Sequence, residues 1–220
     1  MYFEVNLMIG FYNYTVILTY ISLMSSVLGI FLASGVGGMN AHPEYAMICL
    51  MFSGLCDMFD GKIARTRKRT DEEKCFGIQI DSLCDLVCFG VLPVVIGYSI
   101  GMNSWIDIPV LILFPLCAVI RLAYFNVMEE ARQKKTTERR KVYEGLPVTS
   151  VSLILPLLYS FRKDIGDDAF PAVYGAFLFM IAIAFITRFK VKKPGMKTMF
   201  AFIGLGAVEM AWLIYKTKFQ

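Results

Sequence analysis

Residues 57–85 read DMFDGKIARTRKRTDEEKCFGIQIDSLCD and separate two apolar runs, MICLMFSGLC at 47–56 and LVCFGVLPVVIGYSI at 86–100. About 20 mainly apolar residues are enough for a helix to cross the hydrocarbon layer of a bilayer. The stretch therefore predicts two neighbouring membrane helices joined by a short polar loop. Two pairs of aspartates stand at the helix ends that meet this loop.

The rest of the chain repeats the apolar pattern. Hydrophobic residues make up 57% of the 220 residues and charged residues 18%, against about 25% charged in ordinary soluble domains. No basic residue precedes the first run and no cleavage site follows it, so we expect this run to remain as a span rather than a signal peptide. We expect one all-α domain over residues 1–220, a bundle of six or seven spans, because Glu209 interrupts the last window. The predicted windows are 14–34, 43–65, 78–101, 105–128, 146–162, 169–188 and 198–215.

Basic residues predict the orientation, because cytoplasmic loops next to membrane spans are enriched in Lys and Arg. Of the 22 Lys and Arg residues, 17 follow the second, fourth and sixth predicted spans. These loops are therefore expected in the cytoplasm of a multi-pass cell-membrane protein. The charged loops are not interleaved with stacking aromatics, so anionic membrane lipid is the expected neighbour and no nucleic acid partner is expected.

The four aspartates are spaced as two helical pairs. Asp57 and Asp60 are three residues apart, and Asp81 and Asp85 four apart, so each pair shares one face of its helix. If the two helices pack antiparallel, all four carboxylates converge just inside the cytoplasmic boundary, where they would repel one another without cations. An ion-pair network with nearby Arg and Lys, or a solvated cap on the helix ends, is the alternative.

Carboxylate oxygens favour Mg²⁺, Mn²⁺ or Ca²⁺ over zinc, and four of them can hold two ions. Such ions act on phosphoryl oxygens, and Arg65, beyond Asp60, is suited to a phosphate oxygen. Gly61, Ala64 and Gly77 would let a flat nucleotide approach the helices, although close helix packing explains each small residue equally well.

The residues also resemble a family signature. The pattern D-x-x-D-G-x-x-A-R, followed by a spacer and G-x-x-x-D-x-x-x-D, is that of the CDP-alcohol phosphotransferases, and all eight of its fixed positions are present, from Asp57 to Asp85. The spacer between Arg65 and Gly77 has eleven residues where the signature has eight. We expect the additional residues to lengthen the cytoplasmic loop.

Within the family, residues 76–90, 121–126 and 144–147 are most similar to the branch that makes phosphatidylserine. The resemblance implies a helical bundle, commonly a homodimer, with a polar cavity open to the cytoplasm. It implies transfer of the phosphatidyl group from CDP-diacylglycerol to the hydroxyl of L-serine, with release of CMP. By this resemblance Asp57, Asp60 and Asp81 hold Mg²⁺ or Mn²⁺ and Asp85 completes the site as general base. The residues implied to receive CDP are Asp57, Asp60, Gly61, Ala64, Arg65, Gly77 and Asp81.

Two further polar residues lie in the fourth span. Arg121 is expected to bind the serine carboxylate or a lipid phosphate, unless it forms an internal salt bridge with an aspartate. Asn126 is assigned to the same site, with a plain helix-end contact as the alternative. Other acceptors, namely glycerol 3-phosphate or inositol phosphate, and an archaeal-type lipid donor remain open, and a divalent-cation transporter is the candidate from another class.

Overall fold

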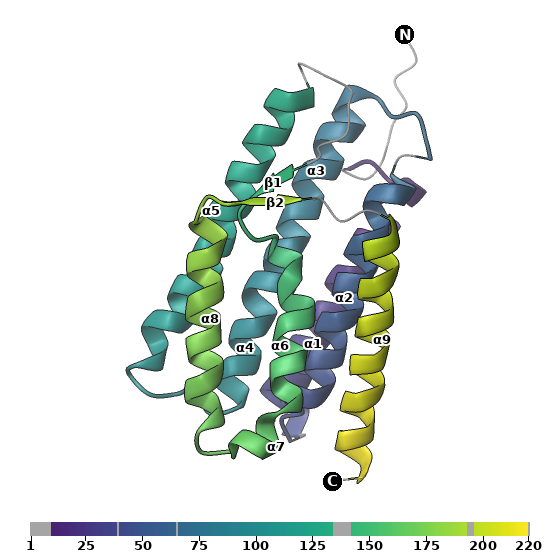
Figure 1. Ribbon diagram of the computed structural model, residues 1–220. Helices are drawn as coiled ribbons and strands as arrows, with labels where there is room; N and C mark the ends of the chain where they lie inside the picture. The colour runs from purple at the N-terminus through teal and green to yellow at the C-terminus, as the bar shows by residue number, and fades with distance from the viewer. Residues whose placement is uncertain (1–9, 39, 65, 134–141, 193–195, 220) are drawn as a thin grey trace.

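The computed structural model describes residues 10–38, 40–64, 66–133, 142–192 and 196–219. Long helices lie side by side in one bundle (Figure 1). The helices are α1 Ile17–Ser34, α2 Pro43–Ile63, α3 Asp71–Asp85, α4 Leu92–Ser99, α5 Asp107–Gln133, α6 Val151–Ser160, α7 Arg162–Ile165, α8 Phe170–Ile186 and α9 Met196–Phe219. Short η segments are η1 Tyr14–Val16, η2 Val36–Gly38, η3 Leu86–Val91 and η4 Val148–Ser150, and the strands are β1 Val142–Glu144 and β2 Lys190–Lys192.

Small and hydroxylated residues hold α1 against α2. Gly35 ends α1 in the left-handed conformation, with φ at 64°, and the chain returns through a short turn. Ser26 and Ser53 hydrogen-bond across the interface at 2.8 Å, and a Cβ atom on Gly29 would lie 2.9 Å from Cβ of Cys49. Small side chains let helix backbones approach closely, which is the usual packing of membrane helices.

The third predicted span begins earlier than expected. Thr70 and Glu73 form a capping box, in which each side chain accepts a hydrogen bond from the other residue's backbone N–H, and α3 therefore starts at Asp71. The prediction that the spacer only lengthens a loop is thus wrong for residues 71–76, which are helical. The local reason is the cap, because it satisfies backbone donors that would otherwise need water.

The same span contains a wide turn directly after Asp85. Residues Leu86–Val91 form a π-helix, and the N–H of Leu92 donates to the carbonyl of Val87. Pro93 follows and has no N–H to continue the regular pattern. The sequence predicted a regular helix here and missed this turn, which is a type of distortion frequent near functional sites.

The second half of the bundle is closed by a small strand pair. Strands β1 and β2 pair antiparallel, with Val142 opposite Lys192 and Glu144 opposite Lys190. They join the segment before α6 to the segment after α8. The molecule is otherwise helical in its described part, so the all-α expectation holds apart from this three-residue ladder.

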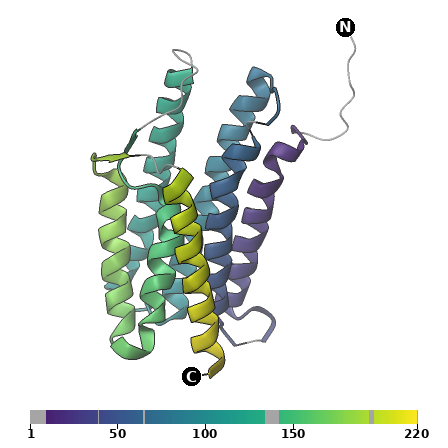
Figure 2. The ribbon, with the colours of Figure 1, turned by 45° about the vertical axis from the view of Figure 1, so that its right-hand side comes forward.

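The last helix is continuous across Glu209. It runs from Met196 to Phe219 and packs against α6 and α2 (Figure 2). The Glu209 side chain faces the bundle and is 5% exposed. Glu209 thus interrupts the apolar window but not the helix, because one inward-facing carboxyl does not remove any backbone hydrogen bond, and the choice between six and seven spans stays a prediction.

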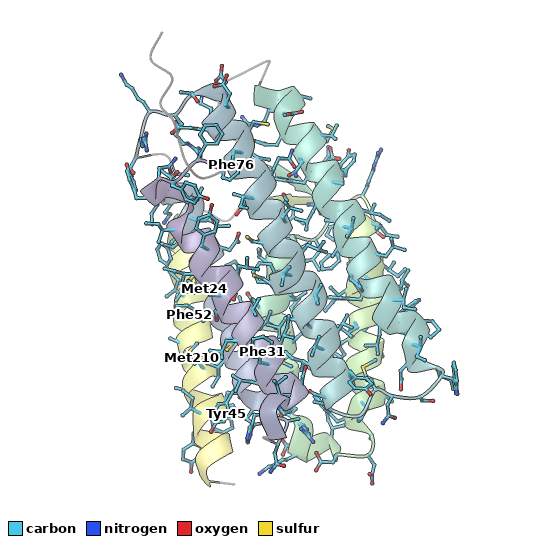
Figure 3. All side chains as sticks on the ribbon, turned by 180° about the vertical axis from the view of Figure 1, so that it is seen from behind. Met24, Phe31, Tyr45, Phe52, Phe76 and Met210 are labelled. Carbon is cyan, nitrogen blue, oxygen red and sulfur yellow. The ribbon has the colours of Figure 1, made fainter. Side chains whose placement is uncertain are left out.

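The helices are suited to a membrane. Three segments are long and apolar enough to cross one, Tyr14–Ser34, Asp71–Ser99 and Asp107–Arg132, and Val148–Ser160, Phe170–Ile186 and Ala201–Tyr215 are shorter apolar helices. Large side chains such as Met24, Phe31 and Phe52 are exposed on the outside (Figure 3). A soluble protein would bury such a surface, so the bundle is that of a membrane protein.

Antiparallel packing brings the basic segments together. The end of α2, the start of α3, the end of α5 and the end of α8 all lie at one end of the bundle (Figure 1). The turn between α1 and α2 and the short helix α7 lie at the other end. One end of the molecule thus carries the helix ends from which the predicted basic loops begin.

Candidate active site

The four aspartates converge as expected. Asp57 and Asp60 lie in the last two turns of α2, and Asp81 and Asp85 in the last two turns of α3. Carboxylate oxygens of Asp57, Asp81 and Asp85 all lie within 4.8 Å of one another. The fourth, Asp60, contacts Asp81 through a hydrogen bond between the carboxyl groups. These four residues are called the aspartate cluster below.

The spacing within the aspartate cluster fits a bound cation. Two carboxylates in hydrogen-bond contact need either a shared proton or a positive charge between them. Among the described residues, the ion pairs join other acids, namely Glu44, Asp71, Glu73, Glu129 and Asp167. An ion pair of the aspartates with Arg65 lies outside the described residues, so the alternative of an ion-pair network is not tested. An oxygen-only group of this kind suits a hard divalent ion.

The side chains of the aspartate cluster are half-buried rather than sealed. A closed carboxylate group without cations would be costly, but partial exposure leaves access for ions and a phosphate-bearing ligand. The cluster sits where α2 ends and α3 is in its final turns, so helices rather than loops fix all four side chains. This placement gives a rigid set of oxygen ligands.

The small signature residues lie beside the aspartate cluster. Gly61 is in the last turn of α2, and Ala64 is the residue that ends that helix. Gly77 is on α3, one turn before Asp81. All three are half-buried. Arg65 lies outside the described residues, so its assignment to phosphate stays a prediction.

Glu73 joins three segments near this site, and sequence reasoning missed it. One carboxylate oxygen accepts from the backbone N–H of Thr70 at 3.0 Å, and the other lies 3.3 Å from the guanidinium of Arg67 and 3.4 Å from Nδ2 of Asn13. The spacing of Thr70 and Glu73 is itself a sequence signal for a helix start. The contact with Asn13, sixty positions away, has no such signal.

Asn126 contacts the helix that carries Asp81 and Asp85. The hydroxyl of Ser82 donates to Oδ1 of Asn126 at 2.8 Å, which joins α3 to α5 next to Asp81. The polar contact of Asn126 thus crosses between two helices, and its assignment to a ligand stays a prediction. Asn126 thus lies near the aspartate cluster, with Ser82 as the partner that the sequence did not reveal.

Arg121 lines a cavity between α5 and α8. Its Nε donates to the carbonyl of Leu146 at 3.1 Å, and its side chain is 7% exposed. The cavity has a volume of about 210 Å³ and is lined also by Tyr124, Glu144, Arg188 and neighbouring apolar residues. The structure therefore gives Arg121 and Asn126 different neighbours and does not join them in one contact.

Charged and aromatic groups order this cavity. The phenol of Tyr124 donates to the Glu144 carboxylate at 3.0 Å, and the guanidinium of Arg188 lies 5.5 Å from the centre of the Tyr124 ring. Gly145, with φ at 76°, lets its N–H reach the carbonyl of Phe189 at 2.7 Å. The strand pair and this glycine set the Leu146 carbonyl that Arg121 contacts.

Comparisons with the sequences of known proteins give an independent test of the resemblance. A family model described as CDP-alcohol phosphatidyltransferase matches residues 12–214. A CDP-diacylglycerol–serine O-phosphatidyltransferase of Saccharomyces cerevisiae is 39% identical over 138 residues, which are 60% of this chain and 49% of the relative. One of Helicobacter pylori is 31% identical over 140 residues, 62% of this chain and 52% of the relative.

An archaeal relative matches as well. The archaetidylserine synthase of Methanothermobacter thermautotrophicus is 33% identical over 144 residues, which are 65% of this chain and 56% of the relative. The chain thus spans about half the length of the curated relatives it matches.

Proposed function

Since the chain belongs to the CDP-alcohol phosphatidyltransferase family, we propose that it transfers the phosphatidyl group of CDP-diacylglycerol to the hydroxyl of L-serine. The products are phosphatidylserine and CMP. The single observation that carries the proposal is the convergence of carboxylate oxygens of Asp57, Asp81 and Asp85 within 4.8 Å, on the two helices that carry all four aspartates of the family signature.

Three aspartates, Asp57, Asp60 and Asp81, are proposed to hold the metal, with Asp85 completing the set. When bound, Mg²⁺ or Mn²⁺ supplies charge that polarises the phosphoryl oxygens and stabilises the leaving phosphate, and the four acids leave room for a second ion or for Ca²⁺. Gly61, Ala64, Arg65 and Gly77 are proposed to receive the cytidine diphosphate portion with the aspartates.

Asp85 is proposed as the general base. Its carboxylate takes the proton of the serine hydroxyl as the hydroxyl oxygen bonds to the phosphorus that carries diacylglycerol. The bond between that phosphorus and the bridging oxygen breaks, and CMP leaves with the bond's electron pair. A positioned base contributes typically about 10²–10⁴-fold to such a step.

Serine suits the charges of the cavity at Arg121 better than a phosphorylated acceptor does. The cavity is lined by two guanidiniums, those of Arg121 and Arg188, and by the Glu144 carboxylate. A zwitterionic amino acid matches this mixture, while Glu144 would repel the double negative charge of glycerol 3-phosphate. Arg121 is proposed as the contact for the serine carboxylate or a lipid phosphate, and Asn126 as a contact on the side of the aspartate cluster.

One assay tests the proposal. Purified protein in lipid nanodiscs receives CDP-diacylglycerol, Mg²⁺ or Mn²⁺ and labelled serine, and labelled phosphatidylserine and CMP are measured. Glycerol 3-phosphate and inositol phosphate replace serine in parallel samples. Product with one of these and none with serine would overturn the assigned acceptor, and CMP release with no acceptor dependence would overturn the transfer.

An archaeal-type donor is the second candidate, because one relative is named an archaetidylserine synthase. The same assay with a CDP-activated ether lipid separates the two donors. A divalent-cation transporter is disfavoured, because its acids are expected near the midplane on broken helices, whereas Asp57 and Asp60 lie in the last two turns of α2, directly before the basic loop that follows this helix.

We also propose that the chain is a multi-pass protein of the cell membrane and a homodimer, with the site open to the cytoplasm. The basic segments gathered at the end that carries the aspartate cluster support this orientation. Cysteine labelling from each side of sealed vesicles tests the orientation and the number of spans. Native mass spectrometry of the detergent complex measures the oligomeric state.

A further inference from the structure

Arg69 lies directly against a glycine of the family signature. A Cβ atom placed on Gly77 would lie 3.1 Å from Nη1 of Arg69, the nearest atom outside the backbone of its own helix. The loop between α2 and α3 therefore folds back over α3 at this residue. The missing side chain of Gly77 makes room for a guanidinium.

This guanidinium faces the same side of α3 as two members of the aspartate cluster. Gly77, Asp81 and Asp85 follow one another at intervals of four residues, so they share one face of the helix. Four residues correspond to about 6 Å along the helix axis. Arg69 thus stands about one turn from Asp81, at the edge of the cluster.

Two nearby basic residues form ion pairs, whereas Arg69 forms none among the described residues. Arg67 pairs with Glu73 at 3.3 Å, and Lys74 pairs with Asp71 at 2.8 Å. Arg69 is half-buried, and within the part of the chain that the structure describes it has no hydrogen bond or ion pair. A guanidinium carries five donors, so a half-buried one without acceptors is prepared for an anionic ligand.

The residue that follows Arg69 is fixed, which limits the freedom of the loop at this point. Thr70 caps α3 and its backbone N–H is bonded to the Glu73 carboxylate at 3.0 Å. Ordering a flexible arginine for each ligand would reduce affinity. Anchoring of the adjacent backbone lowers that cost.

We propose that Arg69 is a phosphate-binding residue, whose guanidinium donates to an oxygen of the diphosphate of the bound cytidine nucleotide above Gly77. The inference rests on the proposed function and deepens it. Its positive charge would offset the repulsion between a diphosphate and nearby carboxylates. Arg69 lies in the spacer that is longer here than in the signature, so the signature itself does not assign it.

The test measures binding rather than turnover. Full-length protein in nanodiscs is titrated with CDP and with cytidine in the presence of Mg²⁺, for wild type, Arg69→Ala and Arg69→Lys. Loss of one charge-assisted hydrogen bond predicts CDP binding weaker by roughly 10- to 100-fold in Arg69→Ala, with an intermediate value for Arg69→Lys. Cytidine, which lacks phosphate, should bind the three proteins equally.

Lys68→Ala is the matched control. It removes one positive charge from the adjacent, exposed position of the same loop, so a general electrostatic effect would weaken CDP binding equally in both variants. We expect a change below about twofold for Lys68→Ala, because exposed charges are screened by salt. Equal effects in the two variants, or none in Arg69→Ala, would overturn the proposal.

Two further arms complete the test. Nanodiscs containing phosphatidic acid test whether Arg69 binds a lipid phosphate instead. If Arg69→Ala weakens the binding of phosphatidic acid and not that of CDP, the nucleotide assignment is contradicted. Gly77→Ala crowds the guanidinium and also the nucleotide that Gly77 is proposed to receive, so it should weaken binding of both CDP and cytidine, whereas Arg69→Ala should weaken only that of CDP. If the wild type makes no phosphatidylserine while CDP binding depends on Arg69, the proposed function fails and the phosphate site holds. If phosphatidylserine forms and CDP binding ignores Arg69, only the inference fails.

Discussion

Two regions of this bundle place carboxyl groups inside membrane helices, and they differ in every other respect. The aspartate cluster gathers four half-buried acids from α2 and α3, with oxygens of three within 4.8 Å. Glu209 in α9 is alone and 5% exposed, and neither of its carboxyl oxygens has a hydrogen-bond partner among the described residues.

The difference shows what turns a membrane acid into a site. A lone buried carboxyl has its lowest free energy when protonated, and then it needs no ligand. Protonation would also remove the repulsion between several carboxylates in contact, but protonated carboxyl groups are poor ligands for a metal ion. A bound cation removes the repulsion and keeps the carboxylates charged. Intramembrane acids are by default treated as functional, and the contrast with Glu209 shows that convergence is the better criterion.

Removal of divalent ions should have the largest effect. Transfer to serine is expected to fall by at least about 10³-fold in chelator, because polarisation of the phosphoryl group by metal is worth several kcal/mol. The rate of CMP release measures this, and readdition of Mg²⁺ or Mn²⁺ should restore it. If the fully chelated protein transfers at an unchanged rate, the aspartate cluster needs no cation, and the proposed difference between it and Glu209 is wrong.

Asp85→Asn should come next. Loss of the proposed base predicts a fall in kcat of about 10²–10⁴-fold, with CDP affinity within about threefold of wild type. Single-turnover formation of phosphatidylserine and equilibrium binding of CDP are the two measurements. A variant that turns over normally would exclude Asp85 as base while leaving the metal site standing.

Ser82→Ala tests how firmly α5 holds the helix of the aspartate cluster. The variant leaves the amide of Asn126 without its partner, and a net loss of about 1 kcal/mol predicts a fall of about three- to tenfold in kcat/KM. Ser99→Ala is the control, because Ser99 bonds only within its own helix, to the carbonyl of Ile96. Equal effects of the two substitutions would indicate general destabilisation.

Glu209→Gln should have the smallest effect on activity, below about twofold, since no charge acts there in the proposed reaction. Glu209→Leu should raise thermal stability, because it removes a buried polar group without a partner, at a cost of about 1–3 kcal/mol. Thermal unfolding in nanodiscs measures the second effect. Loss of transfer in a folded Glu209→Gln protein would show that convergence is not the deciding criterion.

Much of the fold could be predicted from local pattern. The seven apolar windows all contain helices, and the ends of Pro43–Ile63 and Phe170–Ile186 lie within two residues of expectation. The spacing of the aspartates predicted both faces, because helical periodicity places residues three and four apart together. The start of α3 was mispredicted although Thr70 and Glu73 carry a readable cap.

Other features could not be predicted. Three contacts join parts of the chain that have no local pattern in common. They are the contact of Arg69, in the loop before α3, with Gly77 in α3, the bond from Ser82 to Asn126, and the pairing of β1 with β2. The π-turn after Asp85 contains Gly90, where a Cβ atom would lie 3.4 Å from Cβ of Ala118 in α5. No repeating pattern of apolar or polar residues in the sequence signals any of these features.

A helical membrane protein with two acidic helix faces can be predicted from the amino-acid sequence, because hydropathy and helical spacing are local properties of the chain. Which acids come into contact depends on how the helices pack. Glu209 and the aspartates look alike as residues in apolar runs, but packing brings four of them into contact and leaves the fifth alone. The interaction energy of charges depends on their separation in space, and distance along the sequence does not specify that separation.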